Sequence, residues 1–193
     1  MHPLQIGHIA LYVAAAATPV ALALPTTTMK TIRQEAGAGC AELSTTRPNW
    51  KITHAASSDW PGGGGGRVEL FAQHVPTGVT AACDVEYRLD GQTGAIVGHD
   101  PTAAHDCLNF GAADLLTSVR LDMDTLTLSL RSRWACDDSA AAPAPTYIAT
   151  GVTALARDTS PGACLVEPSQ VGDSTTCPIA DVEVQGELTE HDW

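Results

Sequence analysis

The chain is poor in aromatic and basic residues. Aromatic side chains make up 5% of its 193 residues, and only two of them are phenylalanines. Lys and Arg number 10 against 22 Asp and Glu, which gives a formal net charge of -12. Because the sequence has no basic stripe, nucleic acid is not expected as a partner. With so few aromatic residues, a core must be built mainly from Val, Leu, Ile and Ala.

The N-terminus lacks charge altogether. The first 25 residues contain no Lys, Arg, Asp or Glu, and residues 9–24 are apolar apart from Thr18-Pro19. Small residues at Ala21 and Ala23 suit a signal peptidase, so the pattern predicts a signal peptide over residues 1–23. The apolar run is too short for a membrane anchor and is interrupted by a proline. We therefore expect a secreted, extracellular protein with no membrane partner.

The clearest structural signal runs from Thr125 to Cys136. Apolar residues on one phase of a two-residue repeat alternate with polar residues on the other: Leu126, Leu128, Leu130, Trp134 and Cys136 against Thr125, Thr127, Ser129, Arg131 and Arg133. Successive side chains of a strand point to opposite faces, so this pattern indicates a half-buried β-strand. Its length of about ten residues exceeds the usual strand and predicts a central place in a sheet.

The rest of the chain reads as short strands separated by turns. Strands are expected at residues 50–54, 67–74, 79–89, 95–98, 118–122, 146–155 and 181–188. The strand at 67–74 has ambiguous faces, because Phe71 opposes Val68 and Leu70. Residues 57–66, with five glycines, are predicted to be a flexible loop, and residues 157–178 a long disulfide-closed loop.

These patterns predict an all-β fold, a compact antiparallel β-barrel or sandwich in a single domain. No segment shows a convincing helical period. The expected organisation is the signal peptide, a flexible N-terminal arm at residues 24–47 and a β-domain at residues 48–193.

Six cysteines follow the predicted signal peptide, which favours three disulfides among fifteen connectivities. Cys83 and Cys107 flank a hairpin-like stretch, and so do Cys164 and Cys177. This leaves Cys40 to pair with Cys136, which lies on the inward phase of its strand. A bond between the Cys40 residues of two subunits is the open alternative. Close Cys-Cys or Cys-His pairs of the kind that bind zinc are absent, and no metal or cofactor is expected.

Several residues could carry chemistry, although a structural reading is favoured for most. The pairs His99-Asp100 and His105-Asp106 suggest a metal site or half of a catalytic triad, but solvated loop polarity beside a disulfide is the favoured explanation. Acidic pairs that a glycosidase could use also suit turns and strand ends: Asp122/Asp124, Asp137/Asp138 and Glu183/Glu187. Trp50 and Trp134 are expected in the core. Trp60, in the glycine-rich loop, is the candidate exposed anchor, and Arg131 and Arg133 are candidate partner contacts.

Over residues 40–188 the chain resembles the secreted fungal family of the Alternaria major allergen. The resemblance starts with Cys40 and, ten residues later, Trp50-Lys51-Ile52. It continues through the segment TLTLSLR and the strand Thr146-Tyr147-Ile148-Ala149-Thr150. The pairs Cys83–Cys107 and Cys164–Cys177 resemble the two internal disulfides of that family.

The resemblance implies a non-enzymatic allergen or effector that contacts plant hosts and binds a host defence protein or a small phenolic ligand. In the type protein the N-terminal cysteine links two subunits, whereas Cys136 of this chain offers an internal partner for Cys40. We therefore predict a monomer rather than a covalent dimer. The alternatives are a small secreted acidic hydrolase and a carbohydrate or cell-wall binding module that uses Trp60.

Overall fold

The computed structural model describes residues 38–111, 114–138, 143–170 and 172–192. The predicted signal peptide, residues 1–23, lies outside them. Nearly all regular structure in the described chain is β-strand, and every strand pair is antiparallel. The predicted all-β class is therefore confirmed.

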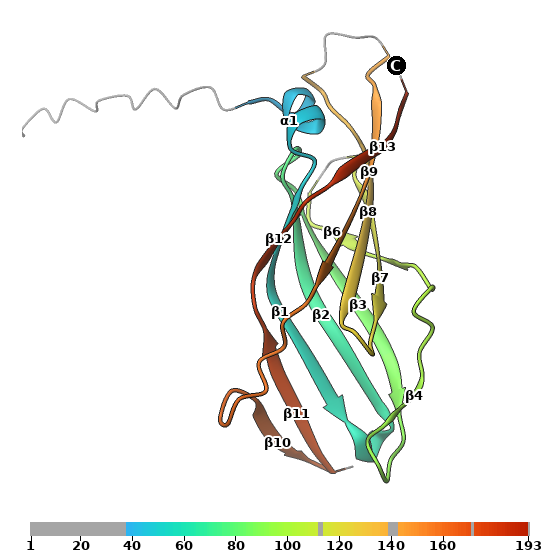
Figure 1. Ribbon diagram of the computed structural model, residues 1–193, viewed down its shortest axis with the longest axis vertical. Coiled ribbons are helices and arrows are strands. Elements are labelled where there is room, and N and C mark those ends of the chain that lie inside the picture. Colours follow the sequence, from blue (N-terminus) through green and yellow to red (C-terminus); the bar gives the residue numbers. More distant parts are fainter. Residues whose placement is uncertain (1–37, 112–113, 139–142, 171, 193) are drawn as a thin grey trace, which may run out of the picture. The chain divides into compact units, whose positions relative to one another are not determined.

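Two sheets make up the fold (Figure 1). The eight-stranded sheet has the order β10-β11-β1-β2-β3-β4, with β12 paired to β1 and β6 paired to β3. Its members are β1 (Trp50–Trp60), β2 (Gly65–His74), β3 (Thr80–Leu89), β4 (Ile96–Gly98), β6 (Leu108–Asn109), β10 (Leu165–Ser169), β11 (Gly172–Ile179) and β12 (Val182–Val184). The five-stranded sheet has the order β13-β9-β8-β7-β5. Its members are β5 (His105–Asp106), β7 (Leu116–Asp122), β8 (Thr127–Ala135), β9 (Thr146–Ala154) and β13 (Glu187–Asp192).

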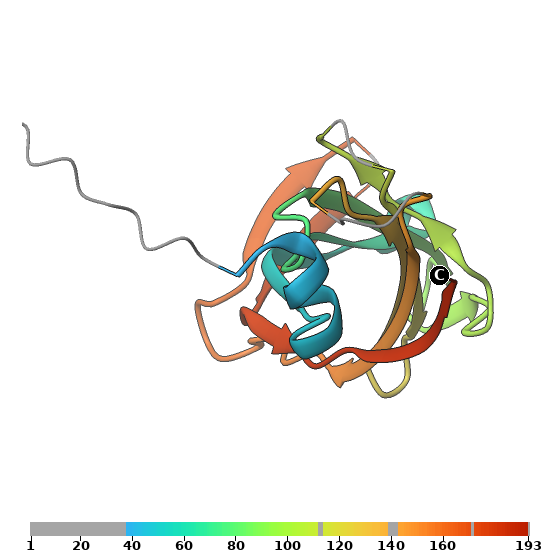
Figure 2. The ribbon, with the colours of Figure 1, turned by 90° about the horizontal axis from the view of Figure 1, so that it is seen from above.

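The inner faces of the two sheets share one hydrophobic core, and Figure 2 shows the sheets curving around it. Among the described strands the sheets remain separate, with β10 and β4 as the edges of one and β13 and β5 as the edges of the other. Of the two predicted architectures, the sandwich is therefore the one that the chain adopts, and the barrel is not closed.

Strand β8 is the middle strand of its sheet, as its long alternating pattern predicts. Leu128, Leu130 and Trp134 are at most 2% exposed. The strand begins two residues later than expected, because Leu126 has a φ of 51° and belongs to the preceding turn. Ser132 also faces inward and is fully buried. Its hydroxyl accepts a hydrogen bond of 3.0 Å from the indole of Trp50, which satisfies both groups inside the core.

The glycine-rich stretch at residues 57–66 is a tight β-hairpin, so its prediction as a flexible loop is wrong. Most of it belongs to β1 and β2, separated by a short turn, η1 (Pro61–Gly63), and by Gly64 with a φ of 69°. Gly66 lies against the ring of Tyr87, where an added Cβ would fall 2.3 Å from a ring carbon. These glycines provide a positive φ and a close strand–ring contact, which composition alone cannot distinguish from flexibility.

The predicted loop at residues 157–178 also contains regular structure. Strands β10 and β11 form a hairpin within it, and the Cys164–Cys177 disulfide joins the start of that hairpin to its second strand. The sequence gives few apolar alternations here because β10 is an edge strand, with Leu165 and Val166 both more than half exposed.

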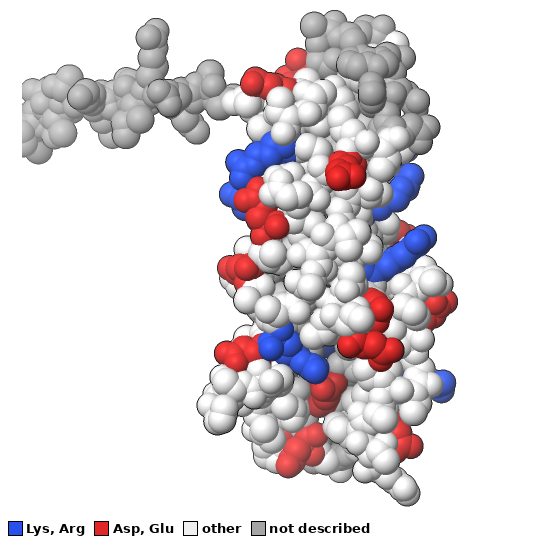
Figure 3. All heavy atoms as spheres, in the orientation of Figure 1, with Lys and Arg blue, Asp and Glu red and all other residues white. Residues whose placement is uncertain are grey.

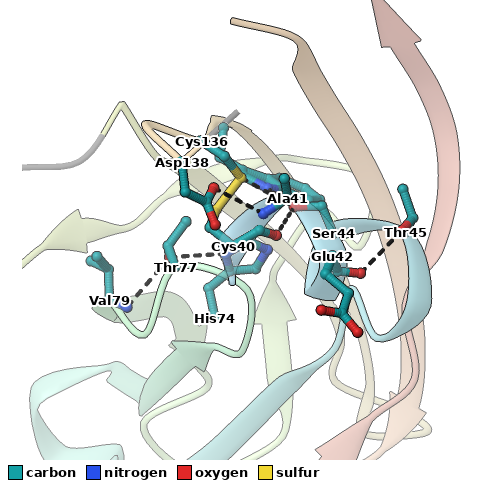
Figure 4. Close-up of a disulfide and its surroundings, with 11 residues drawn as sticks. Cys40, Ala41, Glu42, Ser44, Thr45, His74, Thr77, Val79, Cys136 and Asp138 are labelled. Atoms are coloured by element: carbon teal, nitrogen blue, oxygen red, sulfur yellow. Dashed lines mark hydrogen bonds between the residues drawn. A yellow bond between two sulfur atoms is a disulfide. The ribbon is translucent and has the colours of Figure 1, made fainter. Parts of the chain in front are cut away.

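Residues 40–46 form a helix, α1 (Cys40–Thr46), that the sequence does not predict. The predicted flexible arm at residues 24–47 therefore ends in an ordered element. A helix of seven residues has little stability on its own, so its contacts must hold it in place. The Cys40–Cys136 disulfide and a hydrogen bond from the Ala41 amide to Asp138 supply two of them (Figure 4).

The rings of His74, Trp50 and Trp134 form an aromatic cluster in the core, and the indole of Trp134 donates a hydrogen bond to Ser44 of α1. Figure 4 shows His74 and its contact with Thr77. The ring of His74 is fully buried, 4.3 Å from the ring of Trp134 and 5.8 Å from that of Trp50. Its Nδ1 lies 3.0 Å from the Thr77 hydroxyl, and its Nε2 has no hydrogen-bond partner. Burial lowers the pKa of His74 to about 3, so the folded protein holds this ring neutral at neutral pH.

Candidate functional site

Both phenylalanines of the chain lie on the outer face of the eight-stranded sheet. Phe71 in β2 is 37% exposed and Phe110, just after β6, is 62% exposed. Their ring centroids are 6.0 Å apart in an edge-to-face arrangement. Phenylalanine is usually buried, and a contiguous apolar patch on a surface marks a place where something binds. In a chain with so few aromatic residues, this pairing identifies the candidate site.

The pairing of neighbouring strands brings the residues of the site together. Phe71 of β2 is paired with Ala82 of β3, and Ala82 is paired with Leu108 of β6. The Cys83–Cys107 disulfide, with a Cα–Cα distance of 4.4 Å, ties the segment carrying Leu108 to β3. The small side chain of Ala82 between two large apolar ones leaves a hollow in the sheet surface.

This hollow, the aromatic groove, has a volume of about 470 Å³. The buried side chains of Leu70 and Cys83 form its floor. Its walls are the apolar and aromatic side chains of His54, Phe71, Ala82 and Leu108, and its rim consists of the carboxylates of Glu69, Asp84 and Asp106. No Lys or Arg is among these lining residues. An apolar hollow with an acidic rim can hold an aromatic ring and favours a ligand that carries a positive charge.

His54 occupies an unusual backbone conformation at the edge of the aromatic groove. It has a φ of 51°, and it lies where the register between β1 and β2 shifts between Thr53 and Ala56. Such bulges redirect side chains, and positive φ costs energy in residues other than glycine. The imidazole is exposed and meets the ring of Phe71 edge to face at 5.9 Å. The strained backbone at His54 thus places a third ring beside those of Phe71 and Phe110.

Substituting His54 should separate this strain from the role of the ring. His54→Gly and His54→Ala both remove the imidazole, but only glycine adopts the positive φ without a steric penalty. We expect the glycine variant to be more stable than the alanine variant by about 1 kcal/mol. Urea unfolding of the two proteins measures the difference. Equal stabilities would show that the backbone at this bulge is not strained.

Trp60, the predicted exposed anchor, is only partly exposed at the end of β1. The guanidinium of Arg67 lies 6.0 Å from its ring centroid, and Gly65 packs against its indole nitrogen. The ring therefore has neighbours of its own chain on two sides. It does not line the aromatic groove.

Arg131 and Arg133 are exposed on the outer face of β8, in the five-stranded sheet, as their phase predicts. The aromatic groove lies on the other sheet. All six cysteines form the predicted pairs, and the sequence separations of the bonds are 96, 24 and 13 residues. No free cysteine remains.

The two His-Asp pairs do not form a common site. The Nε2 atom of His99 lies 2.5 Å from the carbonyl oxygen of Leu121, whereas Asp106 lines the aromatic groove. In the described part of the chain, neither pair belongs to a cluster of three metal-ligating groups. Among the described residues, the one cluster of that kind consists of Cys40, Cys136 and Asp138, and its two sulfurs are joined in a disulfide.

The acidic side chains with shifted pKa values act in local structure. The Asp122 carboxylate accepts a 2.9 Å hydrogen bond from the backbone N–H of Asp124, and this bond lowers its pKa. The pKa is likewise lowered by local hydrogen bonds at Asp90, Asp100 and Asp158, and by Asn49 and Arg47 at Glu183. A glycosidase needs an acid whose pKa is raised, in a pair that spans a cleft. These five carboxyl groups have the opposite shift.

Of the residues that line the aromatic groove, the sequence singles out only Asp106 for chemistry, in the pair His105-Asp106. A further signal is the phase of Phe71, which opposes Val68 and Leu70 and in fact points outward. Leu108 and Phe110 fall in a stretch without clear periodicity, and only the pairing of β6 with β3 brings them beside Phe71.

No helix among the described residues is long and apolar enough to cross a membrane. The three disulfides are compatible with an extracellular protein. Comparison with models of protein families, with curated proteins and with solved structures finds no match to this chain.

Proposed function

We propose that the protein is a non-enzymatic, secreted binding protein that holds a small phenolic ligand in the aromatic groove. The observation that carries this proposal is the contact between the exposed rings of Phe71 and Phe110, extended by the outward-turned ring of His54. Edge-to-face contacts between aromatic rings add attraction beyond the area they bury. A phenol ring fits the apolar walls, and its hydroxyl can reach the carboxylates of the rim.

The resemblance to the secreted fungal allergen family supports the same class of function. The family is associated with small phenolic ligands and with host defence proteins, and both remain predictions for this chain. The acidic rim adds a preference that the resemblance does not contain. Asp84 and Asp106 favour a phenolic amine over a phenolic acid, whereas the carboxylate of Glu69 is already paired with Arg67 at 3.0 Å.

A ligand series of constant ring and varying charge tests the proposal. Tyramine, 4-ethylphenol and 3-(4-hydroxyphenyl)propionate carry one positive, no and one negative charge on the same ring. We expect affinity to fall in that order by about two- to fivefold per step, the range of a solvent-exposed ion pair. Nuclear magnetic resonance titration of backbone amides measures the affinities and shows where each ligand binds.

Matched variants distinguish the aromatic groove from other exposed apolar surface. Phe71→Ser with Phe110→Ser should abolish binding, whereas Leu165→Ser with Val166→Ser, on the edge strand β10, should leave it unchanged. Folding of each variant is checked by its amide spectrum. Equal loss in both double variants, or no binding by any of the three ligands, would contradict the proposal.

The two alternative functions have less support. The hydrolase requires convergent acids with raised pKa, whereas the shifted carboxyl groups have lowered pKa values. The carbohydrate module requires a flat exposed ring, whereas Trp60 is covered in part by Arg67.

A further inference from the structure

The outer face of the five-stranded sheet carries a group of arginines that the proposed function does not use. Arg120 lies in β7, and Arg131 and Arg133 lie in β8; all three are exposed. They account for three of the 10 basic residues in a chain of net charge -12. The two ion pairs among the described residues lie elsewhere and leave these guanidinium groups without a carboxylate partner. Figure 3 shows basic side chains at the margin where β7 and β8 run.

The register places the arginines in a row. Arg131 is paired with Ser118 of β7, and Arg120 is paired with Ser129 of β8. Arg131 and Arg133 are two residues apart on one strand, and Arg120 lies diagonally across from Arg131. Both relations correspond to a spacing of about 7 Å between backbone positions. We call this row the arginine face.

Two adjacent hollows lie along the arginine face, and each is bordered by two of its arginines. The first, of about 150 Å³, lies between Arg120 and Arg131, and the second, of about 280 Å³, lies between Arg131 and Arg133. Ser118 borders both hollows, and Thr150 borders the first. Each hollow therefore combines two guanidinium groups with at least one hydroxyl.

We propose that the arginine face binds a linear polysaccharide that carries carboxylate groups. Guanidinium groups bind carboxylates with two parallel hydrogen bonds, and a repeated pair of arginines suits a repeated anion. The serine and threonine hydroxyls both donate and accept, as sugar hydroxyls do. Two adjacent hollows that share Arg131 suit a polymer with repeated carboxylates, because neighbouring units can occupy both. This second site is centred on the other sheet, and it shares only Asp106 with the lining of the aromatic groove.

Nearby acids limit the attraction. Asp106 borders the second hollow, and Glu187 of β13 is paired with Thr150. The rest of the chain is also acidic. At physiological ionic strength the screening length is about 8 Å, which weakens the repulsion from acids farther away but not from Asp106 at the second hollow. Binding should therefore be measured at that ionic strength.

The test uses the full oxidised protein and polygalacturonate, with dextran as the neutral polymer and polyglutamate as an anion without sugar rings. Isothermal titration at physiological ionic strength should show polygalacturonate bound, dextran not bound, and polyglutamate at least about fivefold weaker. Galacturonic acid monomer should bind much more weakly than the polymer, because it occupies one hollow at a time.

Charge-matched variants locate the site. Arg131→Gln removes the arginine shared by both hollows and should weaken polygalacturonate binding about tenfold. Arg88→Gln removes one exposed charge from β3 of the other sheet and should leave binding unchanged. Three results would overturn the proposal: absence of polygalacturonate binding, equal effects of the two substitutions, or polyglutamate binding as tight as polygalacturonate. The last result would indicate an acidic protein segment as the partner.

Discussion

Replacing Cys40 and Cys136 with alanine is expected to lower the free energy of unfolding by about 4–5 kcal/mol. The bond closes a loop of 96 residues, the longest of the three disulfide loops. In the chain-entropy account, a longer loop restricts the unfolded chain more strongly and stabilises the fold more. The substitution should also release α1, because the bond is the one covalent connection between this short helix and the sandwich apart from the backbone that continues into β1.

The Cys40–Cys136 disulfide lies beside buried core residues, so its loss should also disturb the core. Cys136 is 1% exposed, and its sulfur lies 3.3 Å from the Ser44 hydroxyl. That hydroxyl also accepts a 2.8 Å hydrogen bond from the indole of Trp134. Loss of α1 would remove Ser44 from the cluster and leave a buried indole N–H without a partner, which adds to the cost.

The Cys164–Cys177 bond supplies a matched control. It closes a loop of 13 residues in the hairpin that contains the edge strand β10, so its removal should cost about 3 kcal/mol. Guanidinium unfolding of the two double-alanine variants measures both values. A larger loss for the variant without Cys164 and Cys177 would contradict the role assigned to the long loop.

The wild-type protein under non-reducing conditions should have the mass of a single chain, because Cys40 is bonded to Cys136 of the same chain.

Lowering the pH from 7 to 4.5 is expected to cost the protein about 2–3 kcal/mol of unfolding free energy through His74 alone. The folded state holds the pKa of this ring at about 3, against an ordinary value of 6.5. Between these values the unfolded chain binds a proton that the folded chain does not. The stability that the neutral His74 ring contributes is therefore fully present above about pH 6.5 and is lost progressively as the pH falls toward 3.

The pH window separates His74 from the carboxyl groups. The aspartates with lowered pKa values start from an ordinary value of 3.8, so the stability that they contribute is lost mainly below pH 4.5. His74→Phe keeps an aromatic ring beside Trp134 and removes the titrating group. The Thr77 hydroxyl keeps its hydrogen bond from the Val79 amide in this variant.

The comparison therefore rests on the slope of stability against pH. The wild-type protein should lose about 2–3 kcal/mol more than His74→Phe between pH 7 and 4.5, whatever the absolute stability of the variant. His74→Asn, which can still bond Thr77, provides a second non-titrating variant. If both variants lose as much stability as the wild type over this interval, His74 does not titrate as its burial predicts.

The alternating strand patterns and the cysteine spacing together predict the all-β class and the three disulfides. The phase of β8 predicted its central position and the burial of Trp134, because alternation reports directly on which face is buried. The disulfides followed from local loops and elimination. The glycine content of residues 57–66 predicts a flexible loop, but this stretch is a hairpin in which Gly66 makes room for the ring of Tyr87.

The candidate site was much less predictable. The phase of Phe71 is ambiguous because this large apolar residue opposes Val68 and Leu70, and only the pairing of four strands shows that its ring is outside. The bulge at His54 depends on register, which no local pattern specifies. Helix α1 was missed for a similar reason, since a disulfide stabilises it rather than a helical period.

The most direct test of ligand binding at the aromatic groove is a nuclear Overhauser measurement on the tyramine complex. Leu108 is 68% exposed and borders the groove, so its methyl groups serve as reporters. We predict effects from the ring protons of tyramine to the Leu108 methyl groups and to the ring protons of Phe71. Effects to the indole of Trp60 in their place would contradict the account, because they would put the ligand at the predicted anchor instead of the groove.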